Sequence, residues 1–186
     1  MQRKVTLAST VILSFLVLSA GCLAQSGPIV ALDGAGSGAD FPIVSHGRAA
    51  AIYVAPGNPE TVRTVAEAFA SDVERVTGVR PRMLTSLAEP LPADVILVGV
   101  LGKSPEIDRL RAARKIDTSA VDGKWESALT TVVDRPIPGV QRALVIAGAD
   151  RRGAAYAMFA ISRESGVSPW NWWADVPVRR HSAIYV

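Results

Sequence analysis

The sequence predicts an α/β domain, in which helices pack on a mixed β-sheet. Short apolar segments alternate along the chain with segments whose apolar residues recur at helical spacing, which is typical of this fold class. One apolar segment, residues 94–100, is continuous, as in a central strand that is covered on both faces. The chain has 186 residues, so it is long enough for one domain and not comfortably for two.

Residues 1–24 predict a secretory signal peptide. Arg3 and Lys4 precede an uncharged apolar run over residues 5–18, and small residues follow that run. The run is shorter than the ~20 residues that a helix needs to cross a bilayer. We expect cleavage after Ala24 and export to the periplasm or out of the cell; the alternative is a lipid anchor on Cys22. Because Cys22 is the only cysteine, either route leaves the mature domain without a disulfide.

The charge of the mature chain argues against a nucleic-acid partner. Arg3 and Lys4 account for two of the 20 basic residues, and 17 residues are acidic, so the mature domain is close to neutral. Its basic residues form only short clusters, such as Arg151-Arg152 and Arg179-Arg180. Nucleic acids require a basic stripe instead.

Residues 25–40 are rich in Gly, Ser and Ala and predict a flexible linker. Within them, residues 34–38 have the pattern G-x-G-x-G. Phe41-Pro42 follows, however, where a dinucleotide-binding loop must open a helix. We therefore expect no nucleotide and no other cofactor, and we assign the domain itself to residues 41–186.

The first elements of this domain are two strands and a helix. Residues 41–44 and 50–54 predict the strands, with a turn over residues 45–48 between them. Asn58 is the predicted cap of the helix, and Gly78 is the left-handed residue after its end. Apolar residues at helical spacing predict the buried face of this helix: Val62, Val65, Ala66, Phe69, Val73 and Val76.

The second half of the chain alternates strands with helices. After the strand over residues 94–100, Ser104 and Pro105 predict the start of a second helix. Residues 125–133 predict a half-buried strand and residues 143–147 a buried one. Asp150 then caps a predicted third helix over residues 151–165, which Gly166 ends.

Residues 166–177 form a predicted loop with three of the four tryptophans of the chain. Indole rings either close a core or an interface, which is their more common role, or stack on the apolar faces of sugar rings. The candidate substrate-binding residues of this tryptophan loop are Trp170, Trp172, Trp173 and Asp175.

Glu164 is a further candidate for contact with a substrate. It lies in the last turn of the third helix, where the helix dipole disfavours a negative charge that lacks a partner. An exposed glutamate on a frayed turn is the alternative. His46 and His181 lack the spacing of metal ligands and are expected at the surface, so no metal is expected. A glycosidase needs two opposed carboxyl groups, and no such pair can be assigned in this chain.

Four segments together resemble the N-terminal domain of glycoside hydrolase family 115: GKSP at residues 102–105, GKWE at 123–126, ALVIAGADRRG at 143–153 and GVSPWNWWADVP at 166–177. The resemblance implies a small α/β domain, similar to the accessory domain of hexosaminidase-like glycosidases, that precedes a (β/α)8 barrel. Members of the family are α-glucuronidases, which release glucuronic acid or its 4-O-methyl ether from glucuronoxylan with inversion. Their acid and base lie on the barrel.

The resemblance leads to three hypotheses about function. In the first, the chain is a fragment or truncated product, namely the non-catalytic domain of a secreted α-glucuronidase whose barrel is missing here. The tryptophan loop then docks chiefly on that barrel, with Glu164 beside it as the substrate contact. In the second, the chain is a free-standing exported module that binds aldouronic oligosaccharides through the tryptophan loop. In the third, it is an inactive remnant.

Overall fold

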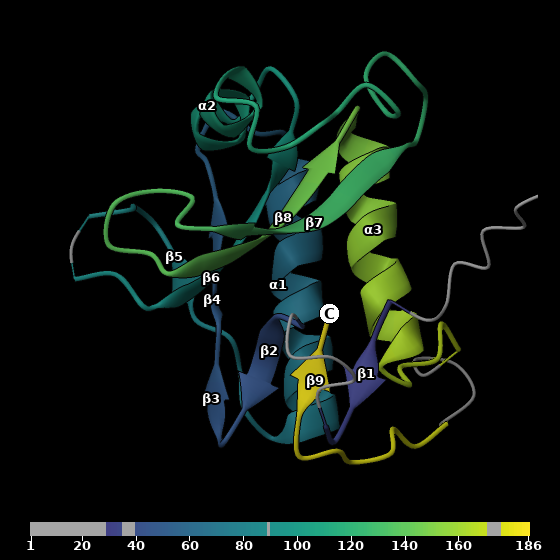
Figure 1. Cartoon of the computed structure of the whole chain (residues 1–186). Helices are drawn as coiled ribbons and strands as arrows, with labels where there is room; N and C mark the ends of the chain where they lie inside the picture. The colour runs from purple at the N-terminus through teal and green to yellow at the C-terminus, as the bar shows by residue number, and fades with distance from the viewer. Residues whose placement is uncertain (1–28, 35–39, 89, 171–175) are drawn as a thin grey trace, which may run out of the picture.

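The computed structural model of the chain describes residues 29–34, 40–88, 90–170 and 176–186. The predicted signal peptide with Cys22, most of the predicted linker, and the site candidates Trp172, Trp173 and Asp175 lie outside these described residues. Helices and strands alternate within them, and the helices pack on β-sheets (Figure 1). The predicted α/β fold class is therefore confirmed.

A five-stranded mixed sheet forms the centre of the fold. Its strand order is β5-β4-β6-β8-β7, and all neighbours are parallel except β7, which runs antiparallel to β8. The continuous apolar segment over residues 94–100 and the buried strand predicted over residues 143–147 are its central strands β6 and β8, and their pairing places Val95 opposite Ala143. The strands span Ala51–Val54 (β4), Met83–Leu84 (β5), Asp94–Val100 (β6), Ala128–Asp134 (β7) and Arg142–Gly148 (β8).

Helices cover both faces of this sheet. Helices α1 (Glu60–Thr77) and α3 (Arg151–Glu164) run side by side on one face, and α2 (Pro105–Ala112) packs on the other (Figure 1). Alternation along β6 divides its side chains between two cores, so that Ile96 faces α1 and α3 whereas Leu97 faces α2. Phe69, on the predicted apolar face of α1, is fully buried in the first core.

A second, smaller sheet joins the two ends of the described chain. Its order is β1-β9-β2-β3, all antiparallel, with β1 at Ala31–Leu32, β2 at Pro42–Ser45, β3 at Arg48–Ala49 and β9 at Ile184–Tyr185. The prediction of a linker over residues 25–40 is wrong for this part, because β1 pairs with β9. The preceding residue, Val30, is only 8% exposed and belongs to the main core, which gives the segment an apolar anchor.

Two strand predictions also require correction. The strand over residues 50–54 does not form a hairpin with residues 41–44. Instead, the short strand β3 pairs with β2, and β4 enters the large sheet, where its first three residues are buried. The strand predicted from Trp125 begins only at Ala128. Glu126 has a left-handed φ of 56° that turns the chain, and Trp125 is 85% exposed.

Several helix ends follow the predicted chemistry. Gly78 ends α1 with a left-handed φ of 78°, a conformation that glycine adopts without a side-chain clash. Asp150 caps α3, because its Oδ1 accepts a hydrogen bond of 2.8 Å from the backbone N–H of Gly153. Gly166 follows the end of α3 with a φ of 93°.

Candidate functional site

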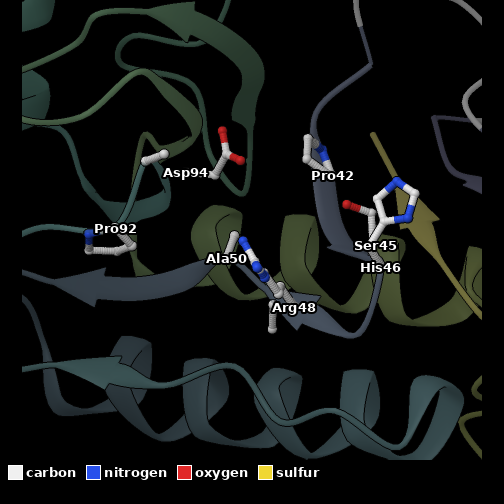
Figure 2. A pocket seen from close by; sticks show the side chains of 9 residues that line it. Pro42, Ser45, His46, Arg48, Ala50, Pro92 and Asp94 are labelled. Atoms are coloured by element: carbon white, nitrogen blue, oxygen red, sulfur yellow. The ribbon is translucent and has the colours of Figure 1, made fainter.

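The most promising site is an open cavity of about 500 Å³ between the β2–β3 hairpin and the start of β6, which we call the hairpin cavity (Figure 2). Pro42, Ser45 and His46 lie on one side of it, and Pro92 and Asp94 on the other. The volume is in the range of small-molecule sites, roughly 300–1,000 Å³. The cavity is lined by Pro42, Ser45, His46, Arg48, Ala49, Ala50, Pro92, Ala93 and Asp94.

A strained turn presents two of these residues. His46 and Gly47 form the two-residue connection between β2 and β3, with φ angles of 49° and 70°. Hairpin turns of this kind favour Asn-Gly, because both central residues need a positive φ. Asparagine is the more common residue at the first position, and histidine is among the other residue types that are enriched at positive φ. Arg48 follows the turn at the position opposite Ser45, and its side chain is exposed.

The opposite wall of the hairpin cavity carries an anchored carboxylate. Asp94 Oδ1 lies 3.4 Å from Nε of Arg142, and both side chains are about one-third exposed. Arg142 is itself held in place, because its Nη1 donates a hydrogen bond of 3.3 Å to the carbonyl of Asp40 and its guanidinium lies 6.0 Å from the centre of the Phe41 ring. The cavity thus places a fixed acidic group opposite the exposed basic group of Arg48.

The carboxyl edge of the parallel strands offers a second location. In open α/β sheets, ligands bind outside the carboxyl ends of strands where the strand order reverses, and here that point lies between β4 and β6. A crevice of about 430 Å³ opens there, lined in part by Tyr53, Gly57 and Lys103. Burial, followed by the charge of Glu106, raises the pKa of the Tyr53 hydroxyl, which favours its neutral form.

Hydrogen bonds of Asn58 join the segments that follow β4 and β6. The side chain of Asn58 accepts a bond of 2.7 Å from the backbone N–H of Val100 and donates one of 3.0 Å to the carbonyl of Ala55. It also bonds to the hydroxyl of Ser104 at 2.9 Å. Asn58 is therefore not the predicted helix cap; Pro59 occupies that position. These polar groups therefore satisfy one another, whereas the crevice itself is lined by the charged residues Lys103, Glu106 and Asp108.

Glu164 is the last residue of α3, as predicted, and is partly buried. Its Oε2 accepts hydrogen bonds from the backbone N–H groups of Ile29 at 2.8 Å and Val30 at 3.2 Å, more than 130 residues away in the sequence. The backbone N–H groups of Ile29 and Val30 are thus the partners that offset the unfavourable position of this carboxylate at the end of α3. The role of Glu164 as a substrate contact stays a prediction.

Trp170 is the described member of the predicted tryptophan site. Its side chain is 67% exposed, and its backbone N–H donates a hydrogen bond of 3.2 Å to the hydroxyl of Ser168. Indoles that close the core of their own domain are buried, so Trp170 does not have that role here. Trp172, Trp173 and Asp175 lie outside the described residues, and their roles stay predictions.

A carboxylate also links the two ends of the described chain. Asp33 Oδ2 lies 2.7 Å from Nδ1 of His181, and Asp33 Oδ1 accepts hydrogen bonds from the backbone N–H of Ser182 at 2.6 Å and from its hydroxyl at 3.0 Å. These bonds, that of His181 first, lower the pKa of Asp33 from 3.8 to about 2. The side chain of His181 is only 12% exposed, although the sequence predicts a surface histidine.

We expect Asp33 to stabilise the fold above about pH 4 and to lose this effect as the pH falls toward about 2. The pKa is lower in the folded chain than in the unfolded one, so the folded state is favoured while the carboxylate is ionised. Asp33→Asn removes the charge and keeps a residue type that tolerates the left-handed φ of 61°. The urea midpoint of the wild type should exceed that of the variant at neutral pH and approach it at low pH. A difference that does not change with pH would contradict this prediction.

Sequence reasoning missed the chemistry of the hairpin cavity. The sequence predicts Ser45 and Arg48 as turn residues and Asp94 as the start of a strand. Of the residues that line the cavity, only His46 is considered for a functional role, and it is expected at the surface. The available signal was the His-Gly pair in a hairpin turn that normally takes Asn-Gly. Among the described residues, no group of three or more His, Cys, Asp and Glu side chains could hold a metal ion. No described helix has the length and apolar character to cross a membrane.

One solved structure relates this fold to a glycosidase. The chain is similar to a family GH115 4-O-methyl-α-glucuronidase with specificity for decorated arabinogalactans, with a TM-score of 0.59 and 29% sequence identity. The match covers 77% of this chain and 17% of that chain. No protein-family model and no curated protein matches. The chain therefore has a GH115-like fold, and the matched region is a small part of the similar enzyme.

Proposed function

We propose that this chain is the N-terminal, non-catalytic domain of an exported α-glucuronidase, which removes glucuronic acid or its 4-O-methyl ether from an acidic polysaccharide with inversion. Residues 1–24 are the signal peptide in this proposal, and residues 41–186 are the domain. Glucuronoxylan is the predicted substrate of the whole enzyme. The specificity of the similar glucuronidase makes decorated arabinogalactans the second polysaccharide to test.

The observation that carries the proposal is the extent of the structural match. The 29% identity runs over 77% of this chain, whereas the match takes up only 17% of the glucuronidase. A domain that corresponds to so small a part of an enzyme leaves most of that enzyme to other segments. In this proposal the barrel is the partner of the domain and supplies the acid and the base.

The distribution of carboxylates supports a non-catalytic role. Inverting glycosidases hold their two carboxyl groups on opposite sides of the substrate, roughly 6.5–9.5 Å apart. Among the residues that the structure describes, Asp94 is the one carboxylate that lines the hairpin cavity. The crevice between β4 and β6 has two, Glu106 and Asp108, but both belong to α2. Neither site therefore offers carboxylates from two facing walls.

We expect the purified 186-residue chain to release no glucuronic acid from glucuronoxylan or from glucuronic-acid-decorated arabinogalactan. Protonation of the leaving group and activation of water require two positioned groups, which this proposal places on the barrel. Chromatography of the released sugars checks the result. Turnover above that of a heat-denatured sample would contradict the proposal, as would a reading frame that continues beyond Val186 without encoding a barrel.

The exposure of Trp170 favours a second candidate, an exported carbohydrate-binding module. An indole that is 67% exposed at the head of the tryptophan loop is available to stack on a sugar ring. In that case aldouronic oligosaccharides change the tryptophan fluorescence of the isolated chain, and Trp170→Ala reduces the change. An unchanged spectrum at millimolar sugar would remove this candidate. Docking of the loop on the barrel, as in the first proposal, instead predicts poor solubility of the isolated chain.

A further inference from the structure

We infer that the hairpin cavity is a binding site for a uronic acid, that is, a pyranose that carries one carboxylate and several hydroxyl groups. The choice of this sugar class rests on the proposed function, and the site itself rests on two features. These are the cavity of about 500 Å³ and its opposed charged groups, Arg48 and Asp94.

The charged groups of the cavity match the polar groups of such a sugar. Arg48 is exposed next to the cavity and presents a planar set of donors, which binds a carboxylate through two parallel hydrogen bonds. Asp94, when ionised, only accepts hydrogen bonds, and sugar hydroxyls donate them. The ion pair with Arg142 holds Asp94 in position before a ligand arrives.

The remaining walls suit the rest of the ring. Figure 2 shows the hydroxyl of Ser45 directed into the space between the two sides, where it can donate to or accept from a hydroxyl of the sugar. Pro42 and Pro92 lie on opposite sides of that space and offer apolar surface to the CH groups of the ring. A small number of polar groups on a partly apolar wall is the usual composition of a small-molecule site.

The charges of Arg48 and Asp94 also favour the binding of a uronic acid over that of other anions. A phosphate ester carries up to two negative charges and would be repelled by Asp94, which faces it from the opposite wall. A neutral sugar satisfies Asp94 but leaves Arg48 without a partner. A uronic acid satisfies both groups, because its carboxylate and its hydroxyls lie on different edges of the ring.

The test is a titration of the full chain, followed by NMR, with methyl glucuronoside and with methyl glucoside as the neutral control. We expect millimolar binding of the glucuronoside and at least about tenfold weaker binding of the glucoside, because the glucoside lacks the carboxylate that Arg48 binds. Arg48→Ser should abolish this preference. The matched control is Arg82→Ser, which removes an exposed arginine outside the cavity and should bind as the wild type does.

A second variant guards against a folding artefact. Ser45→Ala removes only the hydroxyl that points into the cavity, so its thermal midpoint should stay at that of the wild type while its affinity falls several-fold through the loss of one hydrogen bond. Equal binding of both sugars, or unchanged binding in Arg48→Ser and Ser45→Ala, would overturn the inference. Absence of binding by the wild type would also overturn it. The proposed function is then still judged separately, by turnover and by the downstream reading frame.

Discussion

Gly153→Ala is expected to lower the free energy of unfolding by about 3 kcal/mol, and Gly153→Val to prevent folding altogether. A Cβ at this position would lie 2.8 Å from the carbonyl carbon of Ser127 and closer still to its oxygen. That oxygen cannot move away freely, because it accepts a hydrogen bond of 2.9 Å from the backbone N–H of Ala149. The clash is with backbone and outweighs the roughly 1 kcal/mol that alanine contributes to a helix over glycine.

Thermal unfolding of the wild type and of Gly153→Ala measures this effect. A loss of about 3 kcal/mol corresponds to a midpoint about 10 °C lower in a domain of this size. Gly123→Ala is the matched control, because a Cβ at Gly123 would meet nothing within 4 Å and only the left-handed φ of 71° is strained. That strain costs about 1 kcal/mol. If both variants unfolded at the same temperature, the contact between α3 and the start of β7 would not be as close as described.

Phe69→Ala is expected to lower the free energy of unfolding by about 4 kcal/mol. The ring of Phe69 is fully buried in the core between α1, α3 and the large sheet, so its removal leaves a cavity that the neighbours fill only in part. A loss of this size is a large part of the ~5–15 kcal/mol that stabilises a typical domain.

Phe159→Ala provides the control with the same chemical change. Phe159 lies on the outer face of α3 and is 44% exposed, so we expect a loss below about 1 kcal/mol. Urea unfolding of the three proteins at neutral pH gives the comparison, and an unchanged dependence on urea concentration shows that the unfolded states are alike. Similar losses in both variants would place the core elsewhere than between α1, α3 and the sheet.

Much of the secondary structure follows from local chemistry that the sequence displays. Gly78 ends α1 and Asp150 begins α3, as predicted, because each role depends on one residue and the backbone within a few positions of it. The strand over residues 94–100 was also predictable, since a continuous apolar segment has a stable place only between two covered faces. Phe69 was placed in the core by helical spacing alone.

The candidate sites were far harder to predict from the sequence. Asn58 fits the pattern of a helix cap, yet its side chain binds Ser104, which is 46 residues away. The preference of an asparagine for a cap is worth about 1 kcal/mol, and several hydrogen bonds to buried loops outweigh it. Glu164 was correctly singled out as a carboxylate that needs a partner, but local reasoning could not identify that partner as the backbone of Ile29 and Val30.

The sequence by itself determined the three helices, the central strands and their apolar faces, and the roles of Gly78 and Asp150 at helix ends, because those depend on interactions between near neighbours in the chain. Tertiary structure alone decided that β1 pairs with β9, and that the β2–β3 hairpin stands beside the start of β6 to enclose the hairpin cavity. Pairing between segments that are far apart in the sequence depends on which apolar surfaces fit together once the chain is compact. A short segment of sequence therefore cannot predict such a pairing.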